Sequence, residues 1–179
     1  MTLLAIPVQY VLAAVVLIAA ACDIRSRNIP NWLSLGGVLI GLALHPYLAG
    51  WTGLKFSAGG LGLAVLMFVP LFVLRWLGGG DVKLMAAVGA LAGAGNLFII
   101  FIMDAILGGA VALIAVLFKR RGARTLRNIG RMITALFRGK APYQETEELE
   151  AGSETSMGMP RAVTIALATL LVLWATPKS

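Results

Sequence analysis

The chain has 179 residues, of which 59% are hydrophobic and 13% are charged, and its mean hydropathy is +0.90. A soluble domain carries about 25% charged and about 45–50% apolar residues, so this composition excludes an ordinary soluble domain and indicates a membrane protein. The net charge of +7 does not point to nucleic acid, because the basic residues flank hydrophobic segments, where anionic lipid headgroups are the expected partners. Cys22 is the single cysteine, which excludes an internal disulfide and a four-cysteine zinc site.

Apolar segments separated by turn residues follow one another along the chain. At about 20 apolar residues per span, they predict an all-α polytopic membrane protein with six transmembrane helices, in a single domain over residues 1–179. The expected spans are 3–22, 32–49, 56–76, 82–95, 97–118 and 162–174. The first is expected to be retained, because no Lys or Arg precedes it as in a cleaved signal. The fourth is short and rich in Gly and Ala, so it spans only if it is tilted, thinned or shielded.

Charge asymmetry predicts the orientation of these spans, because cytoplasmic loops collect Lys and Arg. With six spans and the N-terminus outside, only Lys55 and Lys178 of the fifteen basic residues fall on the outer side. The opposite orientation would place the main basic block on the wrong face. We therefore expect both termini to be periplasmic or extracellular.

The long connection at 119–159 is expected to be cytoplasmic, and it divides in two by composition. Residues 119–140 are basic, and at about 100° per residue their arginines gather on one helix face opposite apolar side chains. This pattern predicts an amphipathic interfacial helix among anionic headgroups, with a solvated linker helix as the alternative. Residues 145–154 hold all five glutamates and predict a flexible linker.

The three aspartates are the candidates for chemistry, because a membrane-embedded acid is costly unless it is paired or faces a wet cavity. Asp23 ends the first expected span and Asp81 opens the fourth. Two spans lie between them, so both carboxylates return to the cytoplasmic boundary and can meet there. Asp104 is expected roughly 20 Å from that boundary at 1.5 Å per residue. It is interpreted as a helix-packing acid hydrogen-bonded to a neighbouring span, with a catalytic role as the alternative, and His45 is interpreted as an interfacial residue.

The segments beside Asp23 and Asp81 suit a catalytic loop. Three glycines precede Asp81 and permit close backbone approach before an acid at a helix N-terminus. Proline and asparagine after Asp23 start the next helix. The supporting residues expected around the two acids are Ile29, Pro30, Asn31, Gly78, Gly79, Gly80 and Lys83. Lys83 has two interpretations: it anchors the helix to lipid phosphate, or it favours the ionised form of one carboxylate.

Two carboxylates in one wet site cannot both ionise cheaply, so one keeps a proton. The ionised member takes a proton from an attacking water, and the protonated member donates to the developing oxyanion and the leaving amine. This is the arrangement of an aspartic protease, and the pair titrates as a unit. The alternative is that Asp23 and Asp81 only cap helices and pair with Arg25 and Lys83, which gives no reason for the three glycines.

An Asp that ends the first span before Ile-Pro-Asn, combined with Gly-Gly-Gly-Asp-Val-Lys-Leu at 78–84, resembles the type IV prepilin peptidase family of membrane aspartic proteases. The resemblance runs through the fifth span and weakly around Pro160. It implies that Asp23 and Asp81 form the catalytic pair, without metal or organic cofactor. It also implies cleavage of the basic leader of prepilins and pseudopilins at the cytoplasmic face of the bacterial inner membrane.

Within this family the chain is most similar to the short Tad/Cpa-type peptidases, which process Flp-type prepilins. Larger members carry an inserted domain with two cysteine pairs and also methylate the new N-terminus. With one cysteine and no such insert, N-methyltransferase activity is not expected. The competing class is a non-enzymatic proton-coupled transporter or channel subunit that uses the acids as a proton relay. Such a protein would more naturally place its acids near mid-membrane.

Overall fold

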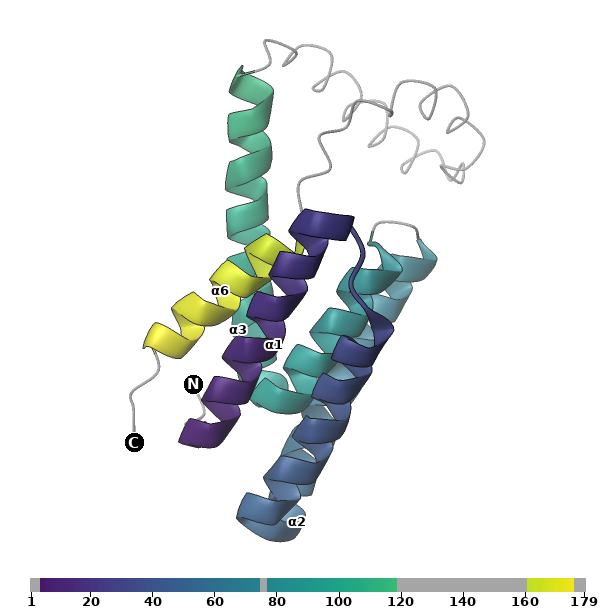
Figure 1. Ribbon diagram of the computed structural model, residues 1–179, viewed down its shortest axis with the longest axis vertical. Coiled ribbons are helices and arrows are strands. Elements are labelled where there is room, and N and C mark those ends of the chain that lie inside the picture. The colour runs from purple at the N-terminus through teal and green to yellow at the C-terminus, as the bar shows by residue number, and fades with distance from the viewer. Residues whose placement is uncertain (1–3, 75–76, 119–160, 176–179) are drawn as a thin grey trace. The chain divides into compact units, whose positions relative to one another are not determined.

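The computed structural model describes residues 4–74, 77–118 and 161–175. Its regular elements there are the helices α1 (Ile6–Ser26), α2 (Asn31–Val73), α3 (Gly79–Phe118) and α6 (Arg161–Ala175) (Figure 1). The prediction of an all-α fold is confirmed for these ranges. The helix predicted at 119–140 and the acidic strip at 145–154 lie outside them.

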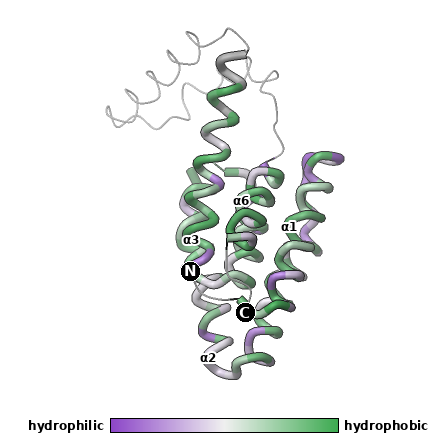
Figure 2. The backbone as a smooth tube through the Cα atoms, turned by 90° about the vertical axis from the view of Figure 1, so that its left-hand side faces the viewer, coloured by the Kyte–Doolittle hydropathy of each residue, from purple (hydrophilic) through white to green (hydrophobic). Residues whose placement is uncertain are grey.

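The chain forms two compact units. One consists of Met1–Gly108 with Pro160–Ser179, and the other is Gly109–Met159. The described part of the second unit is the end of α3, where Leu113 and Ile114 are exposed. The first unit holds all three aspartates, so the site is built from this unit alone. Most residues along its helices are hydrophobic (Figure 2).

Helix α1 buries one stripe of side chains at helical spacing, and this stripe ends in an acid. Its buried members are Val8, Leu12, Val15, Val16, Ala19, Ala20 and Asp23. The stripe faces α6 and α2, against which α1 packs. Arg27 ends the helix in the left-handed conformation and donates its backbone N–H to the carbonyl of Asp23 at 2.9 Å. The apolar pattern of α1 therefore carries a carboxylate into the interior at its last turn.

Helix α2 reverses direction in its middle. Ala49 and Gly50 leave the helical region, and Gly50 has φ 57° and ψ −139°, a backbone conformation that glycine adopts at low cost. A Cβ on Gly53 would collide with the carbonyl oxygen of His45, although a straight helix separates these residues by ~12 Å. The two arms, 31–48 and 51–73, run in opposite directions (Figure 1). They correspond to the second and third expected spans.

Helix α3 also reverses, at Gly93, which has φ 76° and ψ 167°. The sequence placed this break at Gly95 and Asn96, two to three residues later. Leu91 and Leu97 on either side of the reversal have 0% exposure. The turn therefore lies inside the first unit and not at an edge. Irregular backbone at membrane depth is tolerated where protein buries it.

Side chains from both arms of α2 bind the carbonyl groups that the break in α3 releases. The hydroxyl of Ser57 donates to the carbonyl of Ala90 at 2.7 Å. Nε2 of His45 lies 2.9 Å from the carbonyl oxygen of Leu91, both within the interior, which fits an Nε2–H tautomer that donates to it. His45 is therefore a partner of the interrupted helix in the protein interior, and its expected position at the membrane interface stays a prediction.

Glycines let both arms of α2 pack closely on the first arm of α3. A Cβ on Gly41 would come within 2.8 Å of the backbone of Ala90, and a Cβ on Gly60 would overlap the carbonyl of Gly89. Small residues at helix contacts permit such backbone approach. These contacts hold the first arm of α3, which carries Asp81 in its first turn.

The number of membrane crossings stays a prediction. Within the ranges that the structure describes, three helices are long and apolar enough to cross a bilayer: Ile6–Ser26, Asn31–Val73 and Gly79–Val111. Helix α6 has 15 residues and is about 22 Å long, which is less than the hydrocarbon thickness of about 30 Å. Six transmembrane helices are therefore not confirmed, although the reversals at Gly50 and Gly93 fall near expected span boundaries.

Candidate active site

Asp23 caps the start of α6. Its Oδ2 accepts a hydrogen bond from the backbone N–H of Ala162 at 2.9 Å, and this contact is buried. The first backbone N–H groups of a helix have no partner within the helix, and a carboxylate there also interacts favourably with the helix dipole. The last turn of α1 is thereby joined to the first turn of α6.

Asp81 caps its own helix at the third position of α3. The backbone N–H groups of Asp81 and Val82 donate to the carbonyl of Gly78 at 3.1 and 3.3 Å. The carboxylate of Asp81 lies back over this turn, near the backbone of Gly78, which is where the acid of a capping box lies. A Cβ on Gly78 would lie 3.5 Å from Oδ2 of Asp81. The glycine turn therefore wraps closely around this acid.

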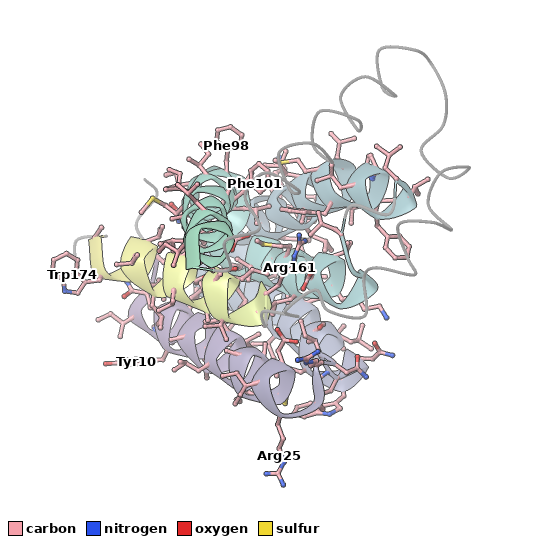
Figure 3. The ribbon with its side chains drawn as sticks, turned by 90° about the horizontal axis from the view of Figure 1, so that it is seen from above. Tyr10, Arg25, Phe98, Phe101, Arg161 and Trp174 are labelled. Atoms are coloured by element: carbon pink, nitrogen blue, oxygen red, sulfur yellow. The ribbon has the colours of Figure 1, made fainter. Side chains whose placement is uncertain are left out.

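The two acids contact adjacent residues at the start of α6, since Ala162 binds Asp23 at 2.9 Å and Arg161 lies 3.8 Å from Asp81, and each acid is only 9% exposed. They come from different helices, the last turn of α1 and the first turn of α3. Both cap helices, as the alternative interpretation of the sequence expected. Its proposed partners are wrong, because Arg25 is exposed and points away from the helices (Figure 3) and Lys83 binds elsewhere.

The loops that follow Asp23 and precede Asp81 pack against each other. A Cβ on Gly80 would meet the side chain of Ile29 at 3.6 Å, and Ile29 is buried. Nζ of Lys83 donates to Oδ1 of Asn31 at 2.8 Å across the same contact. Gly80 and Lys83 in the first turns of α3 thus contact Ile29 and Asn31 at the start of α2.

The remaining supporting residues shape the ends of helices. Pro30 precedes α2 in an extended conformation, and its carbonyl accepts the backbone N–H of Leu33 at 3.1 Å. A Cβ on Gly79 would lie 3.4 Å from the ring of Phe72. The start of α3 therefore packs against the end of α2.

Arg161 is a residue of the site that sequence reasoning missed. Its Nη1 lies 3.8 Å from Oδ2 of Asp81, while its own side chain is 58% exposed. Figure 3 shows it directed from the start of α6 toward the other helices. The sequence feature that could have indicated Arg161 is its position directly after Pro160, at the expected cytoplasmic start of the last expected span.

Asp104 lies near enough to act on the charge of Asp81, which contradicts the expectation that it lies roughly 20 Å from the boundary where Asp23 and Asp81 meet. It interacts with the side chains of Thr164 and Arg161, and its charge also acts on Asp81. The first arm of α3 is short and its turn at Gly93 is buried, so the second arm returns Asp104 to the level of Asp81. Thr164 of α6 lies near Asp104 and donates its hydroxyl to the carbonyl of Arg161 at 2.8 Å, so the hydrogen bond expected between Asp104 and a neighbouring helix stays a prediction.

No group of three or more His, Cys, Asp or Glu side chains that would hold a metal ion occurs within the described ranges. The groups that are present near Asp23 and Asp81 are carboxylates, a guanidinium, a hydroxyl and backbone amides. These groups move protons and bind charges. The arrangement is therefore suited to general acid–base chemistry.

The long apolar helices are those of a polytopic helical membrane protein, and the buried acid pair is its candidate site. Comparison with known families refines this class, because the type IV leader peptidase family matches residues 10–113. This match covers more than half of the 179 residues and includes all three aspartates. The chain belongs to the type IV leader peptidase family.

A preflagellin peptidase from Methanococcus voltae is 38% identical to this chain over 79 residues. The aligned part covers 42% of this chain and 34% of that protein. The chain thus matches about a third of the length of this curated relative. No solved structure matches the chain.

Proposed function

We propose that this protein is a membrane-embedded aspartic endopeptidase in which Asp23 and Asp81 are the catalytic pair. Membership of a leader peptidase family supports peptide hydrolysis. The observation that carries the assignment is that two buried acids from separate helices contact adjacent residues, Ala162 and Arg161, at the start of α6. An aspartic mechanism requires such a pair and one water.

In the proposed reaction the pair holds one proton. The ionised carboxylate accepts a proton from water as the oxygen attacks the scissile carbonyl. The other carboxyl donates to the developing oxyanion and then to the leaving amine. Because the two groups titrate as a unit, the roles belong to the pair and are not divided between Asp23 and Asp81.

The proposed substrate is the basic leader of a type IV, Flp-type prepilin or pseudopilin, cut at the cytoplasmic face of the bacterial inner membrane. Similarity to a preflagellin peptidase supports a pilin-like substrate. The absence of a cysteine-rich insert between the two motifs supports the short Tad/Cpa form without N-methyltransferase activity.

Co-expression with a Flp-type prepilin tests the proposal. The wild type should convert the precursor to the shorter form, and Asp23→Asn and Asp81→Asn should each leave it uncut. Both substitutions preserve side-chain size and remove the proton-accepting oxygen. Glu154→Gln, which neutralises an acid of the acidic strip, is the control and should cleave. Cleavage by either aspartate variant, at wild-type abundance in the membrane, would refute the catalytic pair.

A further inference from the structure

The first turn of α6 contacts both members of the acid pair. The backbone N–H of Ala162 donates to Asp23 at 2.9 Å, and the guanidinium of Arg161 lies 3.8 Å from Asp81. These are neighbouring residues of one helix start, so a single segment touches two acids that come from α1 and α3. This segment lies outside the part of the chain that the leader peptidase family matches, residues 10–113.

Arg161 has a second acidic neighbour. Its charge acts on Asp104 as well as on Asp81, and these acids belong to opposite arms of α3. Thr164 lies three residues further along α6 and therefore on the same helix face. Its side chain interacts with Asp104, and its hydroxyl lies 2.8 Å from the carbonyl of Arg161. One face of α6 thus lies between Asp104 and the acid pair.

Stability alone does not account for this arrangement. An ion pair with an exposed guanidinium contributes little to folding, and the side chain of Arg161 is 58% exposed. Oδ1 of Asp104 is buried without a hydrogen-bond partner among the described residues. An acid buried in this way is costly to the fold. Such groups persist where they serve a site.

We propose, building on the aspartic mechanism proposed above, that Arg161 and Asp104 are positioning residues for the Asp23–Asp81 pair. Arg161 orients the carboxylate of Asp81. Asp104, together with Thr164, holds Arg161 and the start of α6 beside the pair. The pair must be aligned with the attacking water, and a displacement of about 1 Å in such a site reduces turnover by about 100-fold. Loss of the charge of Arg161 or Asp104 should therefore lower kcat more than it weakens substrate binding.

Steady-state cleavage of a prepilin by the purified full chain in detergent tests this proposal. We expect Arg161→Gln and Asp104→Asn to lower kcat about tenfold or more, with KM changed less than about threefold. Arg161→Lys and Asp104→Glu retain the charges and should recover part of the lost kcat. Arg25→Gln removes an arginine that points away from the site (Figure 3) and should behave as wild type.

The outcomes separate this proposal from the mechanism on which it rests. If Asp81→Asn still cleaves, the aspartic mechanism is lost. If Asp81→Asn is inactive while Asp104→Asn and Arg161→Gln keep the wild-type kcat, only the positioning role is lost. A rise in KM at unchanged kcat also overturns it, because it would assign Arg161 to substrate binding. Should Arg161→Gln fail to fold, the near-isosteric Asp104→Asn and the charge-retaining Arg161→Lys decide the question.

Discussion

Replacing Gly93 by alanine tests the buried reversal of α3. The φ of 76° and ψ of 167° at Gly93 lie in a region that is essentially restricted to glycine and costs another residue about 1–3 kcal/mol. The added Cβ would also overlap the ring of Phe56, and overpacking of this kind costs about 1–3 kcal/mol more. Together these terms predict that Gly93→Ala loses about 2–6 kcal/mol of unfolding free energy.

Thermal unfolding of the detergent-solubilised protein measures this loss. At roughly 2–4 °C per kcal/mol for a chain of this size, the midpoint of Gly93→Ala should fall by at least about 4 °C. Gly62→Ala is the matched control, because Gly62 is exposed within α2 and a Cβ there meets nothing within 4 Å. Alanine is favoured over glycine in a helix by about 1 kcal/mol, so the control should be at least as stable as the wild type. If Gly93→Ala and Gly62→Ala have the same midpoint of thermal unfolding, the reversal at Gly93 is refuted.

Two further predictions concern hydrogen bonds between helices. Ser57→Ala removes the donor to the carbonyl of Ala90 and should cost about 1–3 kcal/mol, whereas Ser34→Ala, whose buried Oγ has no partner among the described residues, should be nearly neutral. If Ser57→Ala and Ser34→Ala lose the same free energy of unfolding in chemical denaturation, this expectation is contradicted. Lys83→Ala and Asn31→Ala, which break one exposed contact, should be non-additive by about 0.2–1 kcal/mol in a double-mutant cycle, and strict additivity would refute this contact between the starts of α2 and α3.

The sequence allowed the helical segments to be predicted because their breaks coincide with local signals. Glycine at position 50 supplies the positive φ of the first reversal, and the Gly- and Ala-rich stretch near position 93 indicated the second within a few residues. Counting crossings also led to the hypothesis that Asp23 and Asp81 share one membrane face. Their catalytic role stays a prediction.

The places of Asp104 and Arg161 in the site could not be predicted from the sequence. The distance estimate for Asp104 assumed that the fourth segment crosses the whole bilayer, whereas its turn lies in the protein interior beside Leu91 and Leu97. The depth of a turn is set by packing against α2, and no local pattern encodes it. Arg161 was assigned only to a cytoplasmic loop, because its approach to Asp81 depends on how α6 packs against helices distant in the sequence.

Because α3 reverses at Gly93, the places of Asp81 and Asp104 depend on the number of residues in each arm of the helix. Each residue of a helix advances about 1.5 Å and turns about 100°. One inserted residue in either arm of α3 would therefore rotate an aspartate away from Arg161, even if the turn itself were unchanged. We expect insertions and deletions, natural or engineered, to be tolerated in the connections between helices and not within residues 81–104.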